Sequence, residues 1–133
     1  MGMPAARAND QVTATDTHIV LVPAGPAQVP TPLPHVFAGM LVSALAPTVR
    51  IGGQPAAVVG SVAQNAPPHL PTPPGTTFVR PPSNQASITV GSVTVRITGK
   101  GAARTGDTAT SCNDPADLPV GSVVGTATVR IGG

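Results

Sequence analysis

Four side chains in this sequence could together bind a metal ion: His18, His35, His69 and Cys112. They offer three imidazole nitrogens and one thiolate, which is a complete ligand set for one tetrahedral zinc ion. Between successive candidates lie 16, 33 and 42 residues, which is not the spacing of a zinc finger. The four side chains can form one site only if the fold brings distant segments together.

A catalytic zinc site is the alternative, and it needs an open coordination position and usually a carboxylate base. The four candidates would close the site, and the chain has five Asp and no Glu. Asp16 and Asp114 lie two residues from His18 and Cys112, where they could support those ligands or lie in turns. Cys112 has no Cys-x-x-Cys partner, and no feature indicates the oxyanion hole of a cysteine nucleophile. We therefore expect a structural zinc site and no enzyme, with a small zinc-dependent hydrolase as the alternative.

The elements that would position these side chains are short strands. The chain has 133 residues, of which 15 are Gly and 17 are Pro, so long helices have little room. Hydrophobic residues make up 41% of the chain, but aromatic residues only 2%. A core of small side chains buries little apolar area, so we expect a metal or a partner to add stability. The apolar residues occur in β-type runs at Ile19 to Val22, Thr48 to Ile51, Ile88 to Val90 and Val93 to Ile97.

Charge and composition exclude several classes of protein. The net charge of +2 is small and scattered, and exposed aromatics for stacking on bases are lacking, so we expect no nucleic-acid partner. The sequence has no apolar run of 18 residues, so it predicts no membrane span, and the N-terminus does not resemble a secretory signal peptide. The single cysteine cannot form an internal disulfide. We expect a protein made in the cytoplasm, without stable membrane association.

An internal repeat organises the chain. Residues 49–60 and 95–106 both read as a strand, a Gly-containing turn, an Ala-Ala strand and a Gly. The C-terminal Val-Arg-Ile-Gly-Gly of residues 129–133 is the first half of the same unit, and residues 3–7 are its second half. This predicts an all-β, pseudo-threefold chain of short β-hairpins whose first and last strands pair.

The repeat also places three of the candidate ligands in comparable positions. His18 follows Ala5 by 13 residues and His69 follows Ala56 by 13 residues, whereas Cys112 follows Ala102 by 10. Threefold symmetry would bring these three side chains to one end of the axis, while His35 lies outside the repeat. Between the hairpins we expect stiff Pro-rich loops at residues 23–34, 67–82 and 113–119.

Residues 3–7, Met-Pro-Ala-Ala-Arg, resemble the Pro-Ala-Ala-Arg motif of the PAAR-repeat proteins. The second unit keeps Pro55-Ala-Ala57 but has Val58 in place of Arg, and the third keeps Ala102-Ala-Arg104 but has Gly101 in place of Pro. The Gly-Asp that commonly follows the motif is present as Gly106-Asp107. The resemblance extends over the whole chain.

What the resemblance implies is a three-sided β-pyramid with a structural zinc ion near its apex, bound in that family by three His and one Cys. These ligands correspond to His18, His35, His69 and Cys112. Such proteins cap the trimeric β-helical spike of type VI secretion systems, contractile phage tails and extracellular injection particles. Here the expectation is one PAAR-like domain over residues 1–133, without effector cargo, that forms the membrane-piercing point of the spike.

The resemblance also implies partners. We expect a protein that is monomeric when free, binds one trimeric spike with one tip per trimer, and leaves the cell as part of the particle. The Pro-rich loops could bind other particle components. The alternative outside enzymes is a free-standing binding module such as an adhesin, which the lack of a signal peptide disfavours.

Overall fold

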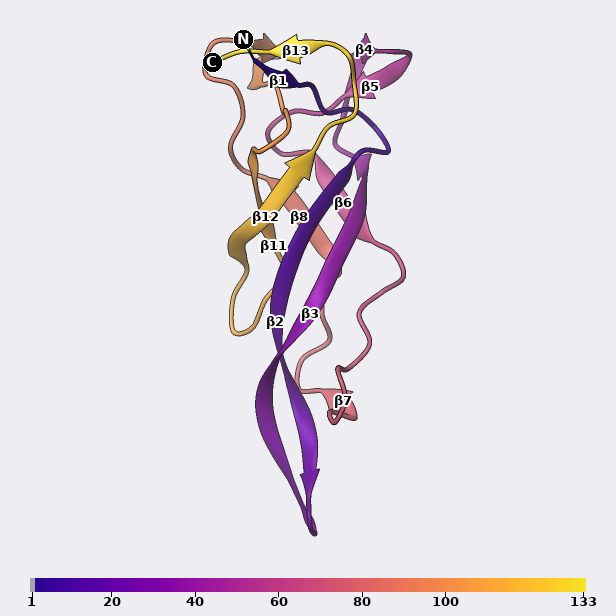
Figure 1. Cartoon of the computed structure of the whole chain (residues 1–133), viewed down its shortest axis with the longest axis vertical. Coiled ribbons are helices and arrows are strands. Elements are labelled where there is room, and N and C mark those ends of the chain that lie inside the picture. Colours follow the sequence, from indigo (N-terminus) through magenta and orange to yellow (C-terminus); the bar gives the residue numbers. More distant parts are fainter. Residues whose placement is uncertain (1) are drawn as a thin grey trace.

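The computed structural model describes residues 2–133, which form strands, turns and irregular segments without a helix (Figure 1). Residues 2–133 therefore contain no helix that is long and apolar enough to cross a membrane. The fold is all-β, as predicted. Its strands fall into one large sheet and three two-stranded sheets, which we call the small hairpins although the third pairs the first strand with the last and has no connecting turn.

A long hairpin is the main element of the structure. Strands β2 (Gln11–Ala24) and β3 (Ala27–Ser43) pair without interruption from Gln11 opposite Met40 to Ala24 opposite Ala27. The hairpins were expected to be short, and residues 23–34 were expected to form a loop, so both expectations are wrong here. Pro30, Pro32 and Pro34 recur every second residue, which puts their missing N–H groups on one edge of β3. Among residues 2–133, no strand pairs with the part of that edge from Ala27 to Ala38, and an edge strand tolerates proline.

The large sheet closes on itself around a small core. Its order is β12-β11-β8-β6-β3-β2-β7, and β12 also pairs with β2. The further strands are β6 (Val62–Asn65), β7 (Thr77–Phe78), β8 (Gln85–Ile88), β11 (Thr108–Ser111) and β12 (Leu118–Val124). Six strands thus enclose a buried cluster in which Phe37, Leu41 and Ile88 are the largest apolar side chains. Of the segments expected as Pro-rich loops, residues 67–82 connect β6 to β8 but contain the strand β7, and residues 113–119 follow β11 but enter β12 at Leu118.

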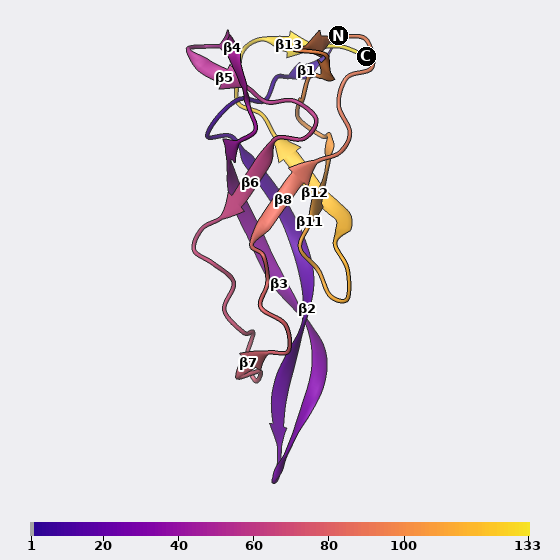
Figure 2. The ribbon, with the colours of Figure 1, turned by 180° about the vertical axis from the view of Figure 1, so that it is seen from behind.

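Three small hairpins lie at the wide end of the molecule, far from the β2–β3 turn (Figures 1 and 2). They pair β4 (Ala46–Ile51) with β5 (Gln54–Ala56), β9 (Arg96–Ile97) with β10 (Lys100–Gly101), and β1 (Met3–Pro4) with β13 (Arg130–Ile131). The register is the same in each, with Ile51 opposite Gln54, Ile97 opposite Lys100 and Ile131 opposite Met3. The first and last strands therefore pair, as the split repeat predicted.

The Ala-Ala segments that follow these hairpins bond to one another in a closed ring. Ala6 donates its N–H to the carbonyl of Ala103 at 2.9 Å, Ala103 donates to Ala57 at 3.0 Å, and Ala57 donates to Ala6 at 3.0 Å. All three side chains are fully buried. The backbones can approach so closely because each residue carries only a methyl group.

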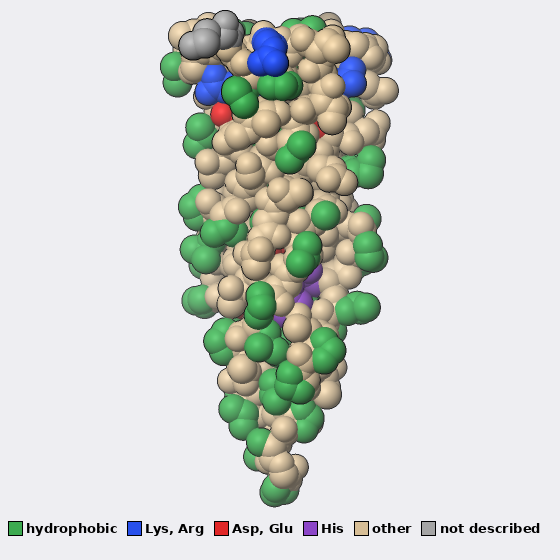
Figure 3. Space-filling view, viewed as in Figure 1, with side chains coloured by type: hydrophobic (Ala, Val, Ile, Leu, Met, Phe, Trp, Pro, Cys, Tyr) green, Lys and Arg blue, Asp and Glu red, His purple; other side chains and the backbone are tan. Residues whose placement is uncertain are grey.

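The molecule tapers from this ring toward the β2–β3 turn, and Figure 3 shows the narrowing in outline. Strands far apart in sequence lie side by side at the wide end, whereas β2 and β3 alone continue to the narrow end. The narrow end is built from mostly exposed residues between Leu21 and Thr31. It therefore depends on cross-strand hydrogen bonds rather than on an apolar core.

Candidate metal centre

Alternation along β2 positions the first two residues of the site. Residues 12, 16, 18 and 20 are buried on one face of the strand, while their neighbours are more exposed. Successive side chains of a strand point to opposite faces, so Asp16 and His18 both point inward. His35 lies on β3 directly opposite Asp16 in the pairing of the two strands. The long hairpin therefore supplies two imidazoles and a carboxylate.

Two other segments complete the site. His69 lies in the connection between β6 and β7, and Cys112 directly follows β11. One potential ligand atom from each of Asp16, His18, His69 and Cys112 lies within 4.8 Å of the other three, and all four residues are buried. The fold thus brings together three of the four predicted ligands, with Asp16 as the fourth member of the cluster. This cluster could hold a metal ion.

The distances within the cluster suit a tetrahedral ion. Cys112 Sγ lies 3.6 Å from His18 Nε2 and 3.4 Å from Asp16 Oδ2, and His69 Nε2 lies 2.9 Å from the same Oδ2. With metal–sulfur bonds of about 2.3 Å and metal–nitrogen or metal–oxygen bonds of about 2.0 Å, tetrahedral ligands lie about 3.3–3.6 Å apart. Of these three pairs, His69 and Asp16 would have to separate slightly, because they now form a hydrogen bond.

His35 lies beside the cluster, but its ring nitrogens are engaged elsewhere. Its Nδ1 lies 2.9 Å from the carbonyl oxygen of Leu33, and its Nε2 accepts the N–H of Thr72 at 3.1 Å. The His35 ring centroid is 5.3 Å from that of His18 and 5.6 Å from that of His69. His35 could bind an ion with Nε2 only by giving up the hydrogen bond from Thr72.

Asp16 is held in place on its other side. Its Oδ1 accepts hydrogen bonds from Ser111 Oγ and, at 3.5 Å, from Asn113 Nδ2. The carboxylate is fully buried, and no Lys or Arg pairs with it among residues 2–133. A buried carboxylate without a cationic partner is costly, and a bound cation would remove that cost.

Asp114 supports His18 from outside the cluster. Its Oδ2 lies 3.5 Å from His18 Nδ1 and accepts the backbone N–H of Ile19 at 2.9 Å. Its Oδ1 accepts Arg80 Nη2 at 2.8 Å. His18 Nδ1 is buried and has no hydrogen bond of good geometry in the described structure. A carboxylate behind one ring nitrogen while the other faces an ion is a recurring arrangement of metal-binding histidines.

The position of His69 is fixed by Asn65. The Asn65 side-chain oxygen accepts the N–H of Ala38 at 3.0 Å, and its Nδ2 lies 3.3 Å from His69 Nδ1. In this arrangement Nδ1 of His69 accepts and Nε2 donates to Asp16. An ion on Nε2 would move the ring proton to Nδ1, so the Asn65 amide would have to present its oxygen there.

Burial favours the uncharged forms of His18, His35 and Cys112 when no ion is bound. Burial is the main cause that lowers the pKa of His18 and of His35, and neighbouring His69 lowers both further. Burial, and then the nearby Asp16 carboxylate, raises the pKa of Cys112 to about 11. A metal ion would bind Cys112 as the thiolate, so binding should release a proton.

Asp16 is the residue that the sequence analysis placed only in a supporting or turn role. The signal that could have found it is the alternation of β2, because Asp16 shares the inward face with His18. The site also lies farther from the narrow end than the expected position near the apex. His18 lies opposite Leu33 in the hairpin. From His18 the strand continues for six residues to Ala24, a length of about 20 Å at the usual rise per residue of a strand.

No protein-family model matches this chain, and no curated protein matches its sequence. The resemblance to PAAR-repeat proteins therefore stays a prediction from the motif residues.

Proposed function

We propose that this chain is the structural tip of a contractile injection machine, with its wide end on a trimeric spike and its narrow end leading into the target envelope. The observation that carries the proposal is the ring of Ala6, Ala57 and Ala103. Each of these residues comes from a different repeat unit, and each makes the same pair of backbone hydrogen bonds. A single chain built from three equivalent units is the form that would match the end of a trimer.

Further equivalences support this pseudo-threefold interpretation. Asn9, Gly60 and Gly106 all have positive φ, and their N–H groups donate to Leu41, Ile88 and Val123 respectively. The polar side chains of Asp10, Ser61 and Asp107 each accept the N–H of the residue three positions earlier. The units therefore repeat in hydrogen bonding as well as in sequence, which favours a three-sided pyramid as the description of the fold.

For the metal, zinc is the ion that the donor chemistry favours. Thiolate and imidazole ligands suit zinc, whereas magnesium and calcium prefer sites made of oxygen ligands. Of the donors present, His18, His69, Cys112 and Asp16 would bind the ion, with His35 packed against them. Zinc would supply the electrostatic link between three segments that are distant in sequence: β2, the connection that contains His69, and the residues after β11. The neighbouring side chains of Ser111, Asn65 and Asp114 would hold these ligands in position.

The proposed role is mechanical. Contraction of a sheath would drive the tube and spike outward, and the tip would concentrate that force on a small area. A tapering protein has little room for an apolar core, so a metal link is an efficient way to resist deformation. Burial of all four ligands favours a structural site over a hydrolytic one, because a substrate would need to reach an open coordination position.

Purification of the chain from its native host under mild conditions tests the proposal. We expect spike, tube and sheath proteins to co-purify with it, and native mass spectrometry to give one tip for each spike trimer. Elemental analysis of the chain should give about one zinc per molecule. Recovery of the chain free of any injection-machine component during expression of the particle would contradict the proposed function. Zinc with a bound solvent ligand, and with Cys112 uncoordinated, would favour the hydrolase.

A further inference from the structure

The wide end of the molecule is basic. We define the base as residues 2–10, 46–61, 92–107 and 126–133, which contain the three small hairpins and the Ala-Ala segments. It contains six of the seven Lys and Arg residues of the chain. Its two Asp side chains, Asp10 and Asp107, are both buried. Figure 3 shows Lys and Arg side chains gathered at the wide end of the visible face.

Three arginines of the base occupy equivalent positions. Arg50, Arg96 and Arg130 each precede the isoleucine that ends the first strand of a hairpin, and all three are exposed. Each donates one hydrogen bond from Nη1 to a carbonyl at the equivalent end of its strand pair, which is a turn for Arg50 and Arg96 and the residue before β1 for Arg130. The distances are 2.9 Å from Arg50 to Gly53, 3.1 Å from Arg96 to Gly99 and 2.8 Å from Arg130 to Gly2.

Most of the hydrogen-bonding capacity of these arginines is free. A guanidinium has five N–H donors, and each of the three uses one of them on this carbonyl. Among residues 2–133, no carboxylate lies within 4.0 Å of Arg50, Arg96 or Arg130. The carbonyl contact also restricts each side chain, so less conformational entropy would be lost on binding a further group.

The two arginines of the repeated motif behave differently. Arg7 donates to the carbonyls of Ile51 and Gly52, and Arg104 donates to Asp107 and to the carbonyl of Gly132. Both are partly buried and connect neighbouring hairpins of the base. Their donors serve the fold, whereas those of Arg50, Arg96 and Arg130 face outward.

We propose that Arg50, Arg96 and Arg130 bind carboxylates at the end of a trimeric partner, one on each of its chains. This inference rests on the proposed function, since it requires the wide end to bind a trimer. A symmetric trimer presents each surface carboxylate three times, and three equivalent guanidiniums are the complement that a single chain needs. Guanidinium and carboxylate groups pair through two parallel hydrogen bonds, which fixes orientation as well as charge.

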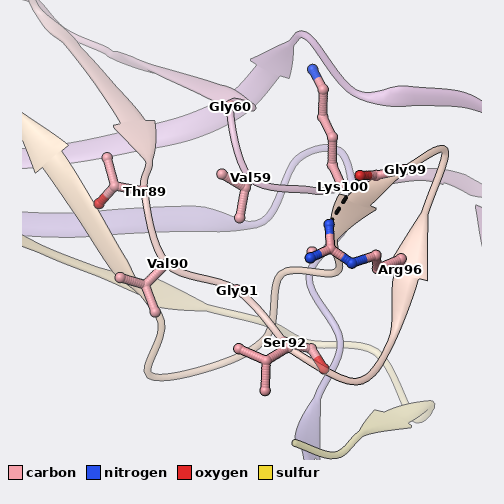
Figure 4. Close-up of a pocket in the computed structure, with 11 residues that line it drawn as sticks. Val59, Gly60, Thr89, Val90, Gly91, Ser92, Arg96, Gly99 and Lys100 are labelled. Atoms are coloured by element: carbon pink, nitrogen blue, oxygen red, sulfur yellow. Dashed lines mark hydrogen bonds between the residues drawn. The ribbon is translucent and has the colours of Figure 1, made fainter.

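The third hairpin carries an additional cation. Lys100 stands where the other two hairpins have Met3 and Gln54, and it is exposed. Lys100 and Arg96 both line a groove of about 650 Å³ between this hairpin and the segment from Thr89 to Val93 (Figure 4). Lys100 adds a second positive charge to this hairpin, although its ammonium and the Arg96 guanidinium point in different directions (Figure 4). We therefore expect loss of Arg96 to weaken binding less than loss of Arg50 or Arg130.

The test measures binding of the purified chain to the purified spike trimer encoded by the same host, by calorimetry over a range of salt concentrations. The variant is the triple substitution Arg50→Gln, Arg96→Gln and Arg130→Gln. We expect it to bind at least tenfold more weakly, with a shallower dependence on salt, because three charge pairs are removed. Each single Arg→Gln variant should retain part of the affinity, with Arg96→Gln retaining the most.

The matched control is Thr15→Glu, Gln28→Glu and Gln64→Glu, which changes the net charge by the same three units on exposed residues outside the base. Its affinity should stay close to that of the unmodified chain. Unfolding temperatures must agree among the proteins compared, and the single variants replace the triple variant if it is unstable. If the unmodified chain binds the trimer and the triple variant binds equally well, the arginine proposal is wrong and the proposed function stands. If the unmodified chain does not bind the trimer, both are wrong.

Discussion

The Nε2 atom of His69 lies 2.9 Å from Oδ2 of Asp16, and both side chains are buried. The two residues are 53 positions apart in the sequence and come from different segments of the fold. Their contact places a carboxylate where the sequence analysis expected a third imidazole. Substitutions can therefore test whether Asp16 or His35 is the fourth ligand beside His18, His69 and Cys112.

Substitution Asp16→Asn should weaken zinc binding by about tenfold or more, equivalent to about 1.4 kcal/mol. The amide keeps the size of the side chain but removes the negative charge that the ion would neutralise. Competition with a chromophoric chelator measures the affinity, and Co²⁺ absorption reports the ligand set independently.

The matched variant is His35→Gln, which keeps an acceptor for the N–H of Thr72. It should retain zinc with an affinity close to that of the unmodified chain, because His35 Nε2 is already bonded to Thr72. Loss of zinc in His35→Gln together with its retention in Asp16→Asn would show instead that three His and one Cys bind the ion.

Substitution Cys112→Ser should lower the unfolding temperature of the zinc-loaded protein by about 10 °C or more. Structural zinc contributes several kcal/mol, and the thiolate is its strongest anionic donor here. Differential scanning calorimetry with and without a chelator checks this. With the chelator present, the unmodified chain and the variant should unfold at nearly the same temperature. A variant that keeps the unfolding temperature and zinc content of the unmodified protein would show that Cys112 is not a ligand.

The metal-free protein should be most stable between about pH 6.5 and pH 9. Burial lowers the pKa of His18 and His35 below 6.5, so the folded state binds protons less tightly than the unfolded state does. The free energy of unfolding therefore falls as the pH drops below 6.5. Burial raises the pKa of Cys112 from 9.0 to about 11, so stability also falls as the pH rises between these values. Urea unfolding in the presence of a chelator, from pH 5 to pH 11, measures both limbs. Cys112→Ala should remove the alkaline limb and leave the acidic one.

The sequence predicted the parts of the fold that depend on local chemistry. The Gly-containing turns at Gly52-Gly53 and Thr98-Gly99 have positive φ at both positions, which is the conformation that their hairpins require. The run Ile19 to Val22 lies in β2, whereas of Ile88 to Val90 only Ile88 is in a strand. Short apolar runs do not fix strand ends, because pairing partners that are distant in sequence decide where a strand stops.

The long hairpin and Asp16 were missed for related reasons. Three prolines in β3 indicate a loop when they are counted, but they are compatible with a strand when they recur every second residue on an unpaired edge. Asp16 became a candidate ligand only once β2 was known to extend through it and to turn it inward. Composition led us to expect a metal or a partner that adds stability, but only the alternation along β2 shows which of its side chains face the cluster.

Substitution Ala103→Val should destabilise the protein by about 1–3 kcal/mol, because it adds two methyl groups where three backbones approach within hydrogen-bonding distance. Ala6→Val and Ala57→Val should cost similar amounts, since the three residues make equivalent bonds and are all fully buried. The control is Ala116→Val, which adds the same groups on an exposed residue and should change stability by less than about 0.5 kcal/mol. Urea unfolding of the four variants measures the differences. A ring that accepted valine at one position and not at the other two would mean that the units differ in packing, and the pseudo-threefold description of the base would then fail.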